Sequence, residues 1–79
     1  MELKRGSVVR AKAGRDKDGF FVVLSAGETV TICDGKRRSL EHPKQKNPKH
    51  LAATAAVLPE DSMGTNREIR KALREYGQG

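Results

Sequence analysis

The chain reads Ala13-Gly14-Arg15-Asp16-Lys17-Asp18-Gly19-Phe20-Phe21-Val22-Val23 near its start, where a charged turn framed by glycines leads directly into an apolar run. Glycine accepts turn conformations that other residues resist, and the apolar run has the composition of a buried strand. Residues 6–12, before the turn, also have the pattern of a strand. The segment therefore predicts a β-hairpin with Arg15 and Lys17 at its tip, and a basic tip suits contact with a polyanion.

The composition describes one small, basic domain. The chain has 79 residues, of which 35% are hydrophobic, and it contains no Trp, so its core must be small and largely aliphatic. Sixteen Lys and Arg residues against ten Asp and Glu residues give a net charge of +6. This balance favours nucleic acid as a partner over an anionic membrane surface, although small basic domains also carry such charge for solubility alone.

No arrangement of residues in the sequence is typical of a catalytic site, so we expect no enzymatic activity and no cofactor. The single Cys33 excludes an internal disulfide, and the neighbouring Asp34 should raise the pKa of the thiol rather than lower it. Cys33, His42 and His50 lack the spacing and the fourth ligand of a metal site, so we expect no metal. The chain has neither a signal-peptide pattern nor an apolar run of about 18 residues. We expect a cytoplasmic protein without membrane attachment.

Five segments are expected to form a mainly β fold, a small five-stranded barrel. They cover residues 6–12, 20–24, 29–32, 38–41 and 51–58. The last of these is Ala-rich and its composition favours a helix, but closing a barrel calls for a strand there. Residues 42–50 contain two prolines and are expected to form an extended loop.

The two adjacent phenylalanines should point to opposite faces of their strand, because side chains alternate along a β-strand. We expect Phe21 to fill the core together with Val23. For Phe20 two roles are open. It can pack beneath a C-terminal helix against Ile69 and Leu73, which is the expected role, or it can stack on a base of a single-stranded nucleic acid.

A C-terminal helix is expected at about residues 66–76. Thr65 and Glu68 have the spacing of a capping box, in which each side chain satisfies a free backbone N–H of the other residue. An apolar stripe follows at helical spacing, formed by Ile69, Ala72, Leu73 and Tyr76. The opposite face carries Arg67, Arg70, Lys71 and Arg74. This basic face is expected to be solvated, with contact to a ligand as the alternative.

Positive charge is concentrated in residues 33–50, where six basic and two acidic side chains give a net charge of +4. Phosphate contacts from such loops supply affinity and register without reading sequence. The candidate RNA-binding residues are those of the hairpin and its flank and those of residues 33–50. They are Lys12, Arg15, Lys17, Lys36, Arg37, Arg38, Lys44, Lys46, Lys49 and His50.

Two segments carry a resemblance to a known family. Residues 8–23, with Gly14 and the charged Arg15-Asp16-Lys17, resemble a KOW motif, and residues 34–51, with Asp34-Gly35-Lys36 and Asn47-Pro48-Lys49-His50-Leu51, narrow the match. Together they resemble the large-subunit ribosomal proteins fourteen-e and their short bacterial KOW-domain relatives. The resemblance implies an SH3-like five-stranded barrel and ribosomal RNA as the partner. One departure is Asp18, which stands where many relatives have glycine, and its carboxylate would weaken phosphate contact unless a partner such as Arg15 neutralises it.

The sequence is thus interpreted as a KOW-type barrel over residues 1–58, followed by a tail over residues 59–79 that carries the helix. The expected function is RNA binding, in a ribosomal or ribosome-associated protein of the bacterial large subunit. Neighbouring ribosomal proteins are possible further partners, and the free protein is expected to be a monomer. The alternative is a transcription-associated KOW module that docks on protein surfaces. Such docking would favour exposed apolar patches, of which the sequence indicates none.

Overall fold

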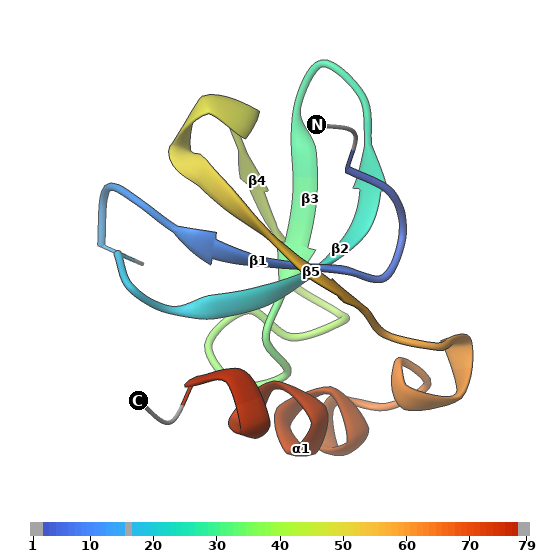
Figure 1. The fold of residues 1–79 in the computed structure, drawn as a ribbon. Helices are drawn as coiled ribbons and strands as arrows, with labels where there is room; N and C mark the ends of the chain where they lie inside the picture. The colour runs from blue at the N-terminus through green and yellow to red at the C-terminus, as the bar shows by residue number, and fades with distance from the viewer. Residues whose placement is uncertain (1–2, 16, 78–79) are drawn as a thin grey trace.

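The computed structural model describes residues 3–15 and 17–77 and has five strands and one α-helix (Figure 1). The strands are β1 (Ser7–Ala11), β2 (Phe20–Ala26), β3 (Val30–Cys33), β4 (Lys44–Lys46) and β5 (Leu51–Val57), and the helix is α1 (Asn66–Gly77). Two short 3-10 turns, η1 (Pro48–His50) and η2 (Glu60–Ser62), flank β5. The prediction of a mainly β fold with a short C-terminal helix is confirmed.

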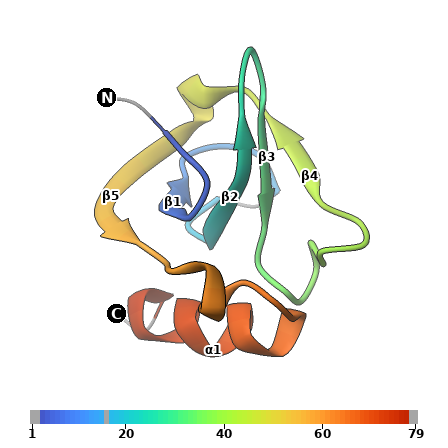
Figure 2. The same ribbon diagram turned by 90° about the vertical axis from the view of Figure 1, so that its right-hand side faces the viewer.

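The strands form one antiparallel sheet in the order β4-β3-β2-β1-β5. Val9 of β1 lies opposite Phe21 of β2 on one side and Ala53 of the edge strand β5 on the other. The register shifts within both the β1–β5 and the β2–β3 pairs, and such bulges sharpen the twist of a sheet. The sheet is strongly curved in Figures 1 and 2, but β4 and β5 remain its two edges, so it is not closed.

One face of the sheet is covered by α1 (Figure 2). Alternation along the strands places Val8, Val22 and Cys33 on this face, and all three are fully buried. They form a cluster with residues of the C-terminal segment, namely Leu58, Met63, Ile69 and Leu73. Phe20 is half-buried against the same cluster, which is the expected packing role.

The concave face of the sheet holds the second half of the core. Phe21 and Val23 lie there, as expected from the alternation of side chains. The other buried members of this cluster are Val9, Ala11, Val30, Ile32 and Leu51. Because consecutive residues of β1 and β2 serve opposite clusters, both central strands are apolar on both faces, which explains the uninterrupted apolar run in β2.

Two expectations for the middle of the chain are wrong. Residues 38–41 form no strand, because the loop between β3 and β4 closes on itself: the backbone N–H groups of Asp34 and Gly35 both donate to the carbonyl of Arg38, at 2.8 and 3.1 Å. The fourth strand is instead β4, inside residues 42–50, which were expected to form an extended loop. The edge position tolerates the nearby prolines, since Pro43 and Pro48 lie just outside the paired residues.

The Ala-rich segment forms a strand and not a helix, as barrel closure suggested. β5 pairs with β1, and the Thr54 hydroxyl donates to the carbonyl of Val8 at 2.8 Å where the register shifts. Tertiary pairing therefore overrides the helical preference of alanine.

The start of α1 confirms half of the expected capping box. The N–H of Glu68 donates to the Thr65 hydroxyl at 3.1 Å, but the Glu68 carboxylate accepts from that same hydroxyl, also at 3.1 Å. Of the apolar stripe, Ile69 and Leu73 are buried, whereas Tyr76 is 36% exposed and lies outside the core. The predicted apolar stripe therefore belongs to the core through Ile69, Leu73 and the partly buried Ala72 only.

Gly35 allows α1 to begin directly against the loop between β3 and β4. Its φ is +76°, and a Cβ at this position would overlap the backbone carbonyl of Asn66. The Asn66 side chain strengthens this contact, because its Oδ1 accepts the Leu40 N–H at 2.7 Å and its Nδ2 donates to the Glu41 carboxylate at 2.9 Å. The amide of Asn66 also holds the pKa of Glu41 below its usual value.

Gly35→Ala should destabilise the protein more than Gly27→Ala. The left-handed conformation alone costs an L-residue about 1–2 kcal/mol, and the overlap with Asn66 adds to this cost. At Gly27 the nearest atom to a new Cβ would be 3.9 Å away, so that substitution should change stability by less than about 0.5 kcal/mol. Urea denaturation of both variants measures the difference. Equal unfolding midpoints would contradict the role given to Gly35.

Candidate nucleic-acid interface

A hollow between α1 and the loop after β3 is lined mainly by cations. Four of them come from the outer face of the helix, and Lys36 faces them from the loop. The lining consists of Phe20, Asp34, Lys36, Arg67, Arg70, Lys71, Leu73 and Arg74. The four cations of α1 are exposed, as expected for a solvated face, and they border this hollow together with Lys36 of the predicted site.

A second hollow continues from Lys36 towards the β1–β2 hairpin. It is lined by Arg15, Lys17, Gly19, Phe21, Asp34, Lys36 and Arg37. Because Asp34 and Lys36 line both hollows, the two form one surface feature, which we call the basic groove. The groove joins three segments that are far apart in the sequence: the β1–β2 tip, the β3–β4 loop and α1.

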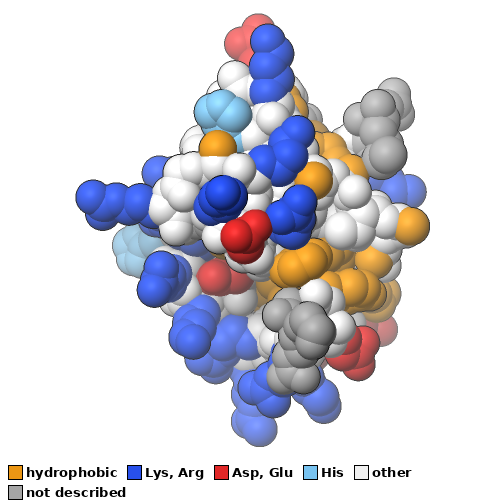
Figure 3. Space-filling model, turned by 60° about the vertical axis from the view of Figure 1, so that its left-hand side comes forward, with side chains coloured by type: hydrophobic (Ala, Val, Ile, Leu, Met, Phe, Trp, Pro, Cys, Tyr) orange, Lys and Arg blue, Asp and Glu red, His pale blue; other side chains and the backbone are white. Residues whose placement is uncertain are grey.

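Nearly all charged side chains that line the basic groove are positive. Eight cations line it, Arg15, Lys17, Lys36, Arg37, Arg67, Arg70, Lys71 and Arg74, and Asp34 is the one carboxylate in the lining of the described residues. The space-filling view shows Lys and Arg side chains gathered over the left and lower parts of this side of the molecule, with few acidic side chains among them (Figure 3). Like charges at this density repel one another, so the groove favours an anionic ligand.

Asp34 fixes the loop that carries Lys36. Its carboxylate oxygen Oδ1 accepts the backbone N–H of Lys36 at 2.8 Å and that of Arg38 at 2.9 Å. This turn directs the loop backbone so that Lys36 and Arg37 face the groove. The Asp34 carboxylate thereby serves as a backbone acceptor within the loop. Arg38 is half-buried, and it is not among the residues that line the groove.

Asp18 has a different partner from the one expected. Its carboxylate accepts from Arg10 Nη1 at 2.8 Å, and not from Arg15. Asp18 also has a φ of +70°. Glycine adopts this conformation without strain, and Asp is among the few other residues that adopt it often. Arg10 belongs to β1, and its guanidinium offsets the negative charge of the Asp18 carboxylate. Asp16, the other acidic residue of the tip, lies outside the described residues.

Lys46 has a structural contact and is only partly exposed. Its ammonium donates to the carbonyl of Ala13 at 3.0 Å and ties β4 to the β1–β2 loop. Gly14 makes room for this contact, because a Cβ there would lie 3.1 Å from Lys46 Nζ, and its φ of +81° favours glycine. The glycine and this lysine of the predicted site thus act together to position the tip.

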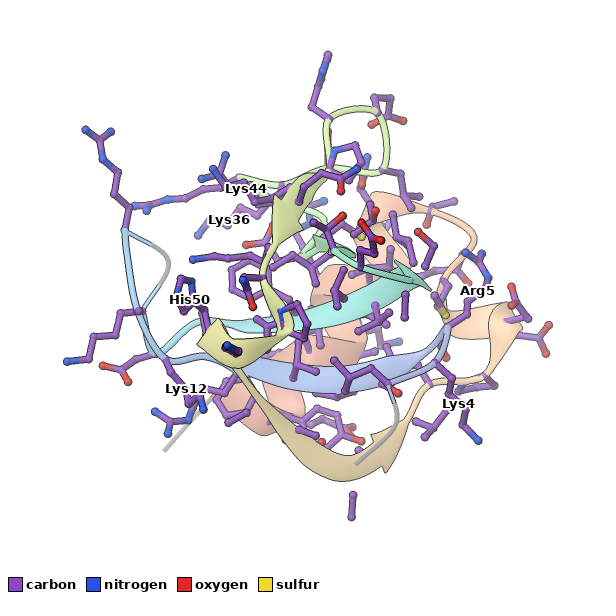
Figure 4. The ribbon with its side chains drawn as sticks, turned by 90° about the horizontal axis from the view of Figure 1, so that it is seen from above. Lys4, Arg5, Lys12, Lys36, Lys44 and His50 are labelled. Atoms are coloured by element: carbon purple, nitrogen blue, oxygen red, sulfur yellow. The ribbon has the colours of Figure 1, made fainter. Side chains whose placement is uncertain are left out.

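The remaining residues of the predicted site do not line the groove. They are Lys12, Lys44, Lys49 and His50. Figure 4 places Lys12, Lys36, Lys44 and His50 towards one side of the molecule and Lys4 and Arg5 towards the opposite side. The N–H of Lys12 donates to the carbonyl of His50 at 2.8 Å, so these two residues are neighbours across the β1–β5 pair. The three lysines of this set carry positive charge outside the groove.

Cys33 lies behind the groove and takes no part in its surface chemistry. Burial and the adjacent Asp34 raise the pKa of its thiol to about 11, so it is protonated at neutral pH. The direction agrees with the expectation from sequence, with burial as the larger cause. Within residues 3–15 and 17–77, no group of three or more His, Cys, Asp or Glu side chains could hold a metal ion.

No model of a known protein family matches this sequence, and no curated protein matches it. Among the described residues, no helix is long and apolar enough to cross a membrane.

The RNA-binding residues predicted from the sequence did not include the four cations of α1. These four are half of the eight cations that line the groove. Helical periodicity places these residues on one face, but it cannot tell whether that face meets another basic segment. The contact of Gly35 with Asn66 decides this, and a close approach between residues 31 positions apart has no local signature in the sequence.

If the helix contributes to the interface, Arg70→Ala with Arg74→Ala should weaken RNA binding more than Lys44→Ala with Lys49→Ala. Both double variants remove two positive charges, but only the first pair lines the groove. We expect about a tenfold loss for the helix pair, from two phosphate contacts at moderate salt. Fluorescence anisotropy with a labelled RNA measures both affinities. An equal loss would mean that net charge matters and that the groove does not.

Proposed function

We propose that this protein binds RNA through the basic groove. One observation carries the proposal: eight cations from three separate segments line one continuous groove that contains a single carboxylate. Of these cations, five are arginines, whose guanidinium groups can hold two phosphate oxygens at once. Backbone contacts of this kind give affinity for many RNA sequences and little discrimination between them.

The proposed setting is the large ribosomal subunit of a bacterium, in the cytoplasm, with ribosomal RNA as the ligand. The support is the resemblance of residues 8–23 and 34–51 to KOW-domain ribosomal proteins. The strand order and the strong curvature of the sheet support an SH3-like barrel of the KOW type. The resemblance puts RNA contact at the tip of the β1–β2 hairpin, next to Gly14, whose φ is positive. Neighbouring ribosomal proteins are further proposed partners, and the free protein is proposed to be a monomer that requires no cofactor and catalyses no reaction.

A transcription-associated module that docks on protein is the second candidate, and one observation favours it. Val57 is 49% exposed and Tyr76 is 36% exposed, and together with Leu58, Pro59 and Ala72 they line a hollow between β5 and α1. These two side chains are the exposed large apolar residues of the described part of the chain, and the sequence did not indicate that they lie together. The charged side chains that line this hollow are Glu68, Lys71 and Glu75. It therefore lacks the excess of cations that would attract RNA.

Sedimentation of a cell lysate through a sucrose gradient should separate the two candidates. A ribosome-associated protein moves with the large subunit at low salt and leaves it when the salt concentration is raised, because phosphate contacts weaken with salt. Recovery with the transcription machinery at both salt concentrations would favour the second candidate.

RNA affinity should fall steeply with salt. If about five phosphates are neutralised, the logarithm of the association constant should fall against the logarithm of the salt concentration with a slope of about −3.5 on single strands. Anisotropy titrations of a labelled oligoribonucleotide between low and moderate salt give this slope. A slope near zero would contradict the proposal.

Lys36→Ala and Lys4→Ala form a matched pair for the same titration. Each removes one positive charge, but Lys36 lies at the junction of the groove and Lys4 is exposed on the opposite side (Figure 4). The slope should become shallower by about 0.7 for Lys36→Ala, which is the contribution of one single-strand phosphate, and should not change for Lys4→Ala.

A further inference from the structure

The part of the basic groove beside α1 has an apolar floor. Phe20 and Leu73 line it, while Lys36 stands on one side and Arg67, Arg70, Lys71 and Arg74 on the other. Leu73 is 6% exposed and faces the core, but Phe20 is only half-buried, so part of its ring borders the groove. An apolar floor does not help to bind a phosphate group, because phosphates are bound through charge and hydrogen bonds.

We propose that this part of the groove holds one unpaired nucleobase against Phe20, and that the ligand is therefore single-stranded RNA or an unpaired loop and not continuous duplex. The inference rests on the proposed function and specifies its substrate class. A base has a flat apolar face with phosphates close on either side along the strand. The groove has the complementary arrangement, an aromatic ring at the floor with cations on both walls.

The geometry of double-stranded RNA excludes this contact. In a duplex the base faces are stacked on one another and only phosphates, sugars and base edges are accessible. An unpaired base, in contrast, can leave the stack and lie on an aromatic side chain, which is the usual mode of single-strand recognition. Arg70 and Arg74, one turn apart on the same ridge of α1, are placed to hold the phosphates beside it.

An acidic peptide with an apolar side chain is the competing occupant. It would match the apolar floor and the cations beside α1. To use the other half of the groove, where Arg15, Lys17 and Arg37 continue the positive surface beyond Lys36, it would need acidic residues at successive positions there as well. A polymer with one negative charge per unit, as RNA has, matches the full extent of the groove, and this favours RNA.

Phe20→Leu tests the proposal because leucine keeps an apolar contact with the core and removes the aromatic face. The probes are a labelled 12-nucleotide oligouridylate and a 12-base-pair RNA duplex, measured by anisotropy at the same salt concentration. We expect Phe20→Leu to weaken binding of the single strand by about tenfold and binding of the duplex by less than twofold. Phe20→Tyr should bind both probes as the wild type does.

Tyr76→Leu is the matched control, because Tyr76 is the other partly exposed aromatic residue and lies outside the groove. It should leave the affinity for both probes unchanged. The salt slope should also be unchanged in Phe20→Leu, since no phosphate contact is removed.

A tryptophan at this position gives a second, independent measurement. The natural chain has no Trp, so Phe20→Trp places the sole tryptophan of the protein in the groove, and Tyr76→Trp places it outside. Stacking of a base should quench the fluorescence of Phe20→Trp on addition of oligouridylate and leave Tyr76→Trp unaffected. This readout remains available if Phe20→Leu does not fold.

Each other outcome has a distinct meaning. Equal losses for single strand and duplex in Phe20→Leu, or no loss and no quenching, would overturn the inference and leave RNA binding by the groove intact. If the wild type bound neither probe at low salt, the proposed function itself would fail. If an Asp-rich peptide containing one Phe displaced oligouridylate and quenched Phe20→Trp more strongly, the occupant would be a protein segment.

Discussion

The basic groove depends on the contact between Gly35 and the first turn of α1. Three features converge there: a positive φ that glycine adopts without strain, a backbone approach that leaves no room for a Cβ, and the Asn66 side chain that bonds both Leu40 and Glu41. The contact fixes the rotation of the helix relative to the β3–β4 loop, because Gly35 lies against both Asn66 and Arg70. Given that rotation, burying Ile69 and Leu73 on one side of the helix obliges Arg70 and Arg74 to face Lys36 on the other.

The energy that holds this arrangement comes from apolar burial. A helix of twelve residues is marginal in water on its own, so α1 is ordered by its contact with the sheet. Ile69 and Leu73 are almost completely buried, and each such side chain contributes about 1.5–3 kcal/mol relative to exposure. Repulsion among the exposed cations opposes the docking, but it acts at the surface, where water and salt weaken it. The apolar contact therefore prevails, and the positive charge is retained for a ligand.

Much of the fold follows from the sequence because its signals are local. Alternation along β1 and β2 separates Val8 from Val9 and Phe20 from Phe21 onto the correct faces, and the apolar stripe and polar ends of α1 give its bounds within a residue. The errors arise where distant partners compete with local pattern. The carbonyl of Arg38 accepts hydrogen bonds inside the loop, so residues 38–41 do not pair with another strand. β4 is a polar segment, and its pairing with β3 has no signal in its own sequence.

The candidate site was predictable in part for the same reason. Charge along the chain identified the β1–β2 tip and the β3–β4 loop, but charge alone does not distinguish cations that face a ligand from cations that serve the fold. Arg10 pairs with Asp18, Arg5 pairs with Glu60 at 2.7 Å, and Lys46 donates to the carbonyl of Ala13.

These structural cations and the groove cations differ in their neighbours and not in their type. Each of the three structural cations has an oxygen acceptor within the protein, whereas the groove cations share one carboxylate, Asp34, whose oxygen already accepts two backbone N–H groups. Their charge is therefore left uncompensated by the fold along a surface that joins the sheet to the helix. A polyanion in the groove would offset that charge at all three segments at once, and by mass action it would stabilise the docked position of α1 that creates the groove.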